Sequence, residues 1–158
     1  DTAPMMDKYR NDSTTYPDAC KQDLQKQLSW IDSVLTNAKE DWIIVAGHHP
    51  IYAETSKDDS ERLDMQNRLD PILRKHKVDM YICGHIHNFQ HIRIPGRNID
   101  YVVNSAGSLA RKVKPTVGTV FCSPEPGFSV ISADKKTLTL RMIDKKGNIL
   151  HTVTRNSQ

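Results

Sequence analysis

The sequence predicts an α/β fold in which parallel strands with helices are followed by an antiparallel meander. The first observation is a pair of short apolar runs, residues 42–46 and 78–83, each followed directly by Gly-His. Runs of this length that are rich in β-branched and aromatic residues are typical of buried strands in a parallel sheet. The second observation is the alternating pattern of residues 128–154, where polar turns separate three further candidate strands. A parallel α/β first half followed by an antiparallel second half predicts two sheets packed face to face, with helices outside.

The predicted elements occupy four consecutive regions of one partial domain, residues 1–158. Because the chain opens without an initiator Met, we interpret this domain as part of a longer one. The regions are an extended entry and loop (1–17), an α/β part with two histidine motifs (18–107), an irregular loop (108–127) and antiparallel strands (128–158).

Apolar spacing predicts one helix before each of the two Gly-His motifs. Residues 18–39 and 61–76 place apolar side chains three or four positions apart, as on the buried face of an amphipathic helix. Ser60 can cap the second helix, and Pro71 either kinks it or starts a new first turn. The side chains expected to face inward are Leu24, Leu28, Ile31, Leu35 and Ala38 in the first helix and Leu63, Leu69, Ile72 and Leu73 in the second.

The remaining strands are assigned from alternation and turn residues. A helix–strand–helix–strand order indicates a right-handed crossover unit over the first part of the chain. A strand pair then follows around Pro95-Gly96-Arg97-Asn98. The strands after the crossover are predicted at 89–94, 99–103, 128–132, 138–143 and 149–154.

Composition excludes two classes of function. The net charge of +3 is small and the basic residues are scattered, so no nucleic-acid partner is expected. No apolar run approaches the length of a membrane-spanning segment. Three cysteines without close spacing give no disulfide framework. Cys83 is expected to be buried in its strand, while a bridge between Cys20 and Cys122 is left open.

Three histidines in the two motifs are candidate metal ligands. His48 follows the first predicted strand, and His85 and His87 follow the second. The carboxyl ends of neighbouring parallel strands meet at one edge of a sheet, where ligands of α/β proteins bind. In an extended segment, residues two apart point the same way, so His85 and His87 are expected to face one cavity with His48. Imidazole suits zinc, iron and related ions.

A histidine at a strand end can also be a simple polar terminus, and an HxH motif occurs by chance. The second strand that ends in Gly-His is the observation that favours a metal site over this alternative. No functional role is assigned to the remaining histidines: His49, His76, His91 and His151.

The two motifs and their flanking residues resemble those of calcineurin-like metallophosphoesterases. Val45-Ala46-Gly47-His48 is similar to the VxxH motif of that family, and Gly84-His85-Ile86-His87 to its GHxH motif. Residues 40–52 and 82–88 resemble the small, tartrate-resistant type of purple acid phosphatase, and this resemblance extends over about residues 21–107. It implies the C-terminal half of a four-layer α-β-β-α sandwich.

In this family, protein ligands hold two metal ions, a ferric ion and a divalent iron, zinc or manganese. The resemblance implies that His48 and His85 bind the divalent ion and His87 the ferric ion. The family motifs GDxG, GDxxY and GNH(E/D), which supply the other ligands, do not occur in the sequence. We therefore expect these residues alone to bind metal poorly, or not at all, and to be inactive.

Lys57 is a candidate substrate-binding residue. In an ungapped comparison it stands where the family usually has a histidine near the substrate phosphate. A lysine could still pair with phosphate as a point charge. The alternative is a solvated loop residue without a role in the site.

For the complete protein, the resemblance implies an acid phosphatase in which a metal-bound hydroxide attacks phosphomonoesters. Two alternatives stay open: a metallophosphoesterase acting on phosphodiesters or nucleotides, and a non-catalytic module with a structural or vacant metal site. Half of a sandwich exposes an edge strand and an apolar face, so the expected partners are the missing N-terminal half or further copies of the chain. Because such enzymes are commonly exported, an extracytoplasmic location, secreted or periplasmic, is expected.

Overall fold

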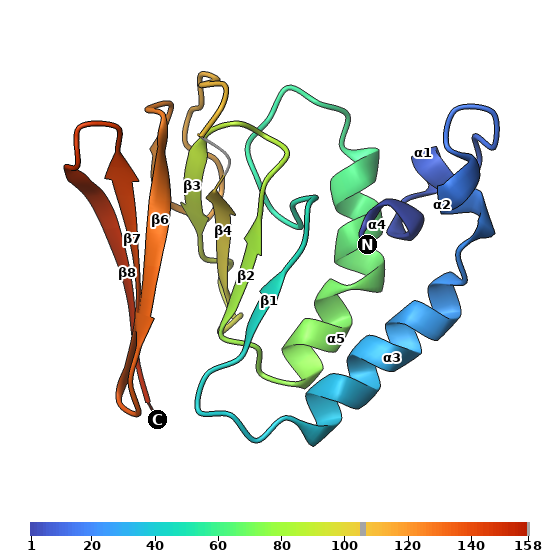
Figure 1. Ribbon diagram of the computed structural model, residues 1–158, viewed down its shortest axis with the longest axis horizontal. Coiled ribbons are helices and arrows are strands. Elements are labelled where there is room, and N and C mark those ends of the chain that lie inside the picture. Colours follow the sequence, from blue (N-terminus) through green and yellow to red (C-terminus); the bar gives the residue numbers. More distant parts are fainter. Residues whose placement is uncertain (105–106, 158) are drawn as a thin grey trace.

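The computed structural model, which describes residues 1–104 and 107–157, has three layers (Figure 1). A group of helices covers one face of a five-stranded sheet, and a three-stranded sheet packs on the other face. The predicted α/β class, with parallel strands followed by an antiparallel meander, is confirmed. In the described part of the chain, no helix has the length and apolar character needed to cross a bilayer.

The helices are shorter and more numerous than the sequence predicted. The first predicted helix is interrupted before Leu24, because Asp23 is extended and its carboxylate accepts a hydrogen bond from the Lys26 amide. The second predicted helix is divided at Leu69, and Pro71 lies in the first turn of the new helix. The elements are a 3₁₀ turn η1 (Ala3–Met5), α1 (Asp7–Arg10), α2 (Pro17–Lys21), α3 (Leu24–Asn37), α4 (Ser60–Arg68) and α5 (Asp70–Lys75).

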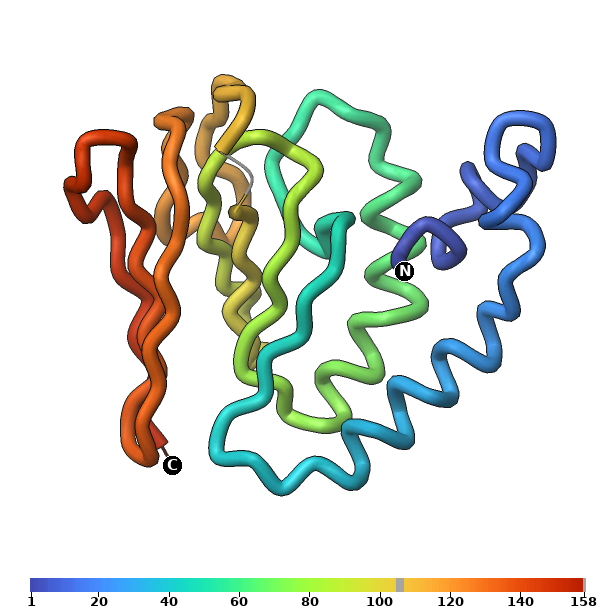
Figure 2. Tube along the Cα trace, viewed as in Figure 1, coloured from blue at the N-terminus to red at the C-terminus, as the bar shows by residue number. Residues whose placement is uncertain are grey.

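Residues 1–17 were expected to form an extended entry and a loop, and this prediction is wrong. They contain η1 and α1, and Met5 and Met6 are 1% and 0% exposed in the core between the helices and the sheet. Apolar burial fixes this segment against α4. The N-terminus therefore lies beside the loop that follows β1 (Figure 2).

The larger sheet has the order β1-β2-β4-β3-β5, and β1, β2 and β4 are parallel. Strand β3 is antiparallel to both β4 and β5. The smaller sheet is the predicted meander, β6-β7-β8. The bounds are β1 (Ile44–Ala46), β2 (Met80–Cys83), β3 (Phe89–Ile92), β4 (Asp100–Asn104), β5 (Thr119–Ser123), β6 (Gly127–Ala133), β7 (Thr137–Asp144) and β8 (Ile149–Asn156).

Two predictions about individual strands are corrected by this topology. Strand β1 was expected to be buried, yet Ile44 is 37% exposed, because β1 is the end of the sheet in the described chain and pairs with β2 on one side. The region 108–127 was expected to be irregular, yet it contains β5. Gly118 has φ +83, and a Cβ there would lie 2.5 Å from the Arg93 carbonyl oxygen. The glycine thus permits a close approach to the end of β3.

The two faces of the larger sheet have separate apolar cores. One core joins the sheet to the helices, and the other joins it to Leu138, Leu140 and Met142 of β7. In α4 the buried residues are Glu61 and Met65, whereas Leu63, which was expected to face inward, is 53% exposed. Two positions along a helix rotate a side chain by about 200°, so burial of Glu61 turns Leu63 toward solvent. All three cysteines are free, so the Cys20–Cys122 bridge is not formed.

Candidate metal centre

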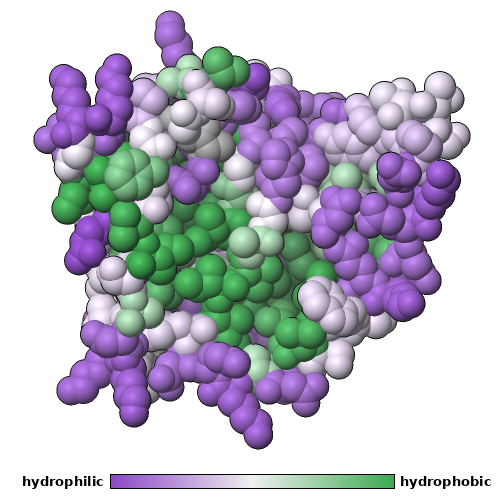
Figure 3. Space-filling model, in the orientation of Figure 1, coloured by the Kyte–Doolittle hydropathy of each residue, from purple (hydrophilic) through white to green (hydrophobic). Residues whose placement is uncertain are grey.

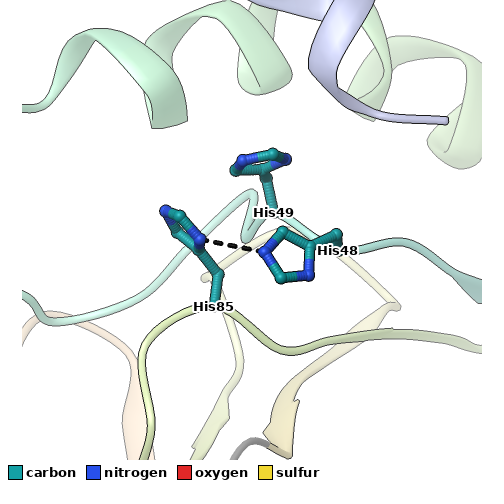
Figure 4. Close-up of side chains that lie close together, drawn as sticks. All are labelled: His48, His49 and His85. Atoms are coloured by element: carbon teal, nitrogen blue, oxygen red, sulfur yellow. Dashed lines mark hydrogen bonds between the residues drawn. The ribbon is translucent and has the colours of Figure 1, made fainter.

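Three imidazoles gather where β1 and β2 end (Figure 4). His48 and His49 follow β1, and His85 follows β2. Because the two strands are parallel, both loops leave the same edge of the sheet. Among the described residues, the ligand nitrogens of these three side chains all lie within 4.8 Å of one another. The sequence placed His48 and His85 together but assigned no role to His49.

His48 and His85 face each other through two ring nitrogens. His48 Nε2 lies 3.0 Å from His85 Nδ1 (Figure 4). Metal–imidazole distances are about 2.0–2.1 Å for zinc, so one ion could contact both nitrogens with little rearrangement. His48 is exposed and His85 is partly buried, which leaves the pair open to solvent on one side. The roles of these side chains as metal ligands stay a prediction.

His49 is held more firmly than its neighbour. It is 5% exposed, its Nδ1 lies 2.8 Å from Thr2 Oγ1, and the Tyr81 hydroxyl donates to its carbonyl oxygen at 2.8 Å. Burial, together with the neighbouring His85 and His48, lowers the pKa of His49 to about 3. Its ring is therefore neutral, which is the form that binds metals. The only sequence signal for His49 was its place directly after His48.

The loop after β2 was expected to be extended, and this expectation is wrong. His85 and His87 both have left-handed backbone conformations, with φ angles of 71° and 64°. Such angles are uncommon outside glycine, and they concentrate at functional sites. The loop brings His85 to His48 and His49, whereas His87 is not a member of that three-histidine group. His87 Nδ1 lies 3.4 Å from Ser108 Oγ, and its carbonyl accepts from the Arg111 amide.

The second ring nitrogen of His85 has two charged neighbours. Its Nε2 lies 2.7 Å from Lys57 Nζ and 3.0 Å from Glu61 Oε2. Burial lowers the pKa of His85, and the nearby Lys57 ammonium lowers it further. Burial also lowers the pKa of Lys57. The contact with His85 places Lys57 at this centre, although its predicted contact with substrate phosphate stays a prediction.

Glu61 is a site residue that the sequence did not reveal. It is 4% exposed, and its Oε1 accepts from Lys8 Nζ at 2.7 Å and from the Tyr9 hydroxyl at 2.9 Å. Burial alone would raise the pKa of Glu61, but these hydrogen bonds outweigh burial and lower it to about 2. Glu61 is therefore a carboxylate at neutral pH. An acidic residue in a first helical turn gave no sign of this role, because its partners come from a distant segment.

Residues 4–89, more than half of the chain, match the model of the calcineurin-like phosphoesterases. This chain belongs to the calcineurin-like phosphoesterase family. The family resemblance drawn from the two Gly-His motifs is thus confirmed. The three-histidine group, His48, His49 and His85, lies within the residues that match this family.

Known relatives of this calcineurin-like phosphoesterase include tartrate-resistant acid phosphatase type 5 of Homo sapiens, which is 31% identical over 134 residues. That match covers 78% of this chain and 40% of the relative. The structure of GAP50, the anchor in the inner membrane complex of Plasmodium, is similar with a TM-score of 0.75 and 22% identity, covering 96% of this chain and 47% of that one. Purple acid phosphatase PPD1 of yellow lupin gives a TM-score of 0.67 at 21% identity, covering 82% and 28%. The chain thus spans less than half of each, and the two structures show the fold alone.

Proposed function

We propose that this chain forms the histidine-bearing part of a dinuclear-metal acid phosphatase that hydrolyses phosphomonoesters. The observation that carries the proposal is the pair of ring nitrogens, His48 Nε2 and His85 Nδ1, that face each other at 3.0 Å from the ends of two parallel strands. The likeness to tartrate-resistant acid phosphatase type 5 supports the reaction class.

The residues fit a metal site by their chemistry and placement. His48 and His85 would hold a divalent iron, zinc or manganese, and His87 would hold a ferric ion. A position of His87 outside the three-histidine group suits a ligand of a second ion, because paired catalytic metals are about 3.5–4 Å apart. Bound ions would acidify a water molecule and neutralise phosphate oxygens. Lys57, beside His85, would pair with the phosphate as a point charge.

The isolated chain should show negligible hydrolysis of p-nitrophenyl phosphate after loading with iron and zinc. The sequence lacks the Gly-Asp and Gly-Asn-His motifs that supply the other ligands in the family. A polypeptide that also contains such motifs, fused upstream, should hydrolyse the same substrate and lose activity on His48→Ala. Robust turnover by the isolated chain that is abolished by His48→Ala would refute the expected inactivity.

The same fused protein separates the two alternative functions. Faster hydrolysis of bis-p-nitrophenyl phosphate or nucleotides than of p-nitrophenyl phosphate would favour the phosphodiesterase alternative. One tightly bound zinc with four protein ligands and no turnover would favour a structural site. An extracytoplasmic location remains part of the proposal and rests on the phosphatase resemblance.

We further propose that the rest of the phosphoesterase domain covers an apolar groove between α3 and β1. The groove has a volume of about 480 Å³, and Trp30, Val34 and Ile44, which line it, are 63%, 48% and 37% exposed. Hydrophobic side chains gather over the middle of this face (Figure 3). Relatives that are more than twice as long have ample chain to cover such a surface.

Without that covering segment, the isolated chain should self-associate through the groove. Replacing Val34 by Lys should shift the chain toward monomer, as measured by light scattering across a concentration series. Leu63→Lys is the matched control, because Leu63 is 53% exposed but lies outside the groove. A wild-type chain that stays monomeric at high concentration would contradict this expectation.

A further inference from the structure

One nitrogen of His85 faces two partners that it cannot satisfy together. Lys57 Nζ and Glu61 Oε2 lie 2.7 Å and 3.0 Å from the same atom, His85 Nε2. An ammonium group only donates hydrogen bonds, and a carboxylate only accepts them. In a neutral imidazole, a ring nitrogen either carries a proton or offers a lone pair. Lys57 and Glu61 therefore favour opposite tautomers of the same ring.

Whether Nε2 carries the ring proton determines whether Nδ1 offers a lone pair or a proton to His48. When Nε2 donates to Glu61, Nδ1 has a free lone pair directed at the gap of 3.0 Å beside His48 Nε2. When Lys57 donates to Nε2, the proton sits on Nδ1 and fills that gap with a hydrogen bond to His48. Only the first arrangement can bind a cation through Nδ1.

We propose that Glu61 is a positioning residue that selects the cation-binding tautomer of His85, and that Lys57 stabilises the opposite tautomer. Cation binding then releases Lys57 from His85, so that its ammonium becomes available to the phosphate of the substrate. This inference rests on the proposed function and specifies how two residues around one histidine regulate it.

The surroundings of the two partners differ in a way that supports these roles. Glu61 is 4% exposed, and its Oε1 is occupied by Lys8 and Tyr9, which leaves Oε2 directed at His85. Lys57 lies in the loop before α4 and carries its ammonium on a flexible four-carbon stem. A fixed carboxylate and a movable ammonium suit a ring that must give up one partner when a cation arrives.

The tautomer of His85 can be measured directly in the metal-free chain. Two-bond ¹H–¹⁵N spectra at about pH 8, above the ordinary imidazole pKa, distinguish the two neutral forms. Lys57→Met should increase the form with the proton on Nε2, and Glu61→Leu should increase the form with the proton on Nδ1. Glu61→Gln should restore the wild-type tautomer, because its amide oxygen still accepts from Nε2.

Titration with Co²⁺ gives the second readout. Glu61→Leu should weaken binding about 10–100-fold, the usual effect of losing the carboxylate partner of a ligating histidine. Lys57→Met should tighten binding instead. Lys21→Met is the matched control, since Lys21 is an exposed lysine that pairs with Asp18 and, among the described residues, has no hydrogen bond to Glu61 or His85. It should leave the His85 tautomer unchanged.

The outcomes separate this inference from the proposed function. An unchanged tautomer in Glu61→Leu, or weaker Co²⁺ binding in Lys57→Met, would overturn the inference even if the wild type binds the ion. A tautomer that responds as expected in a chain that binds no cation would overturn the metal-site function and leave the tautomer selection supported. If Glu61→Leu does not fold, Lys57→Met alone still decides the direction of the effect.

Discussion

Replacing His85 by asparagine should abolish the weak cation binding expected of the isolated chain, whereas the same replacement at His87 should change that binding little. His85 Nδ1 faces His48 Nε2 at 3.0 Å, while His87 lies outside the group of three close imidazoles. Loss of a ligand should exceed the roughly 10–100-fold cost of losing a ligand's hydrogen-bond partner. Isothermal titration with Zn²⁺ and the visible absorbance of Co²⁺ measure the difference.

Asparagine makes this comparison fair, because His85 and His87 share a left-handed backbone, with φ of 71° and 64°. Asparagine tolerates this conformation better than most residues, so backbone strain is matched between the two variants. His49→Asn provides a further test of the third imidazole. Equal losses from His85→Asn and His87→Asn would place His87 in the same site and contradict the grouping seen in the structure.

The position of the site could be predicted because it follows from strand order. Two apolar runs that end in Gly-His, with a helix between them, require parallel strands whose carboxyl ends meet, and this brings His48 to His85. The meander β6-β7-β8 was equally accessible, because alternation and turn residues define it locally. These features depend on short-range patterns.

The remaining features of the site depend on contacts between distant segments. Glu61 accepts hydrogen bonds from Lys8 and Tyr9, which precede it by more than 50 residues, and no local sequence pattern predicts such partners. The left-handed angles at His85 and His87 could not be predicted, because such angles are uncommon for residues other than glycine. Strand β5 was missed because Gly118 and nearby prolines are typical of loops, although this glycine is needed for close packing.

His91 and His151 illustrate the same limit in the second core. The sequence assigned them no role, yet they link the two sheets: His91 Nδ1 lies 2.9 Å from His151 Nε2, and His151 stacks on Phe121. His91 Nε2 in turn lies 2.7 Å from Asp100 Oδ1. A buried polar network of this kind needs each member satisfied, and that requirement appears only once the sheets are packed.

Replacing Asp100 by alanine should cause a large loss of stability. Asp100 is 0% exposed at the start of β4, and its carboxylate accepts from Arg93 Nε at 2.5 Å and from Arg155 Nη1 at 2.9 Å, besides its contact with His91. Removing it leaves these groups unpaired, which typically costs about 3–5 kcal/mol for a buried ion pair. Urea unfolding of both proteins measures the difference in free energy.

The effect of Asp100→Ala should depend on pH in a defined direction. Burial would raise the pKa of Asp100, but hydrogen bonds from His91, Arg93 and Arg155 outweigh burial and hold it well below its ordinary value. A carboxylate with a lowered folded-state pKa contributes fully above its unfolded pKa of about 3.9, and loses that contribution as the pH falls toward the folded value. The difference between wild type and variant should therefore be constant near neutrality and narrow below about pH 4.

Asp32 supplies the matched control for this experiment. Like Asp100 it contacts a histidine and a basic side chain, His76 and Lys75, but its side chain, on α3, is 35% exposed. Solvent screens such pairs, so Asp32→Ala should change the free energy of unfolding much less. Equal losses of unfolding free energy in Asp100→Ala and Asp32→Ala would contradict the conclusion that burial makes the Asp100 contacts strong. Asp100 lies at the start of β4, whereas the histidine loops follow the carboxyl ends of the parallel strands β1 and β2. Asp100→Ala that remains folded should therefore bind Co²⁺ as the wild type does.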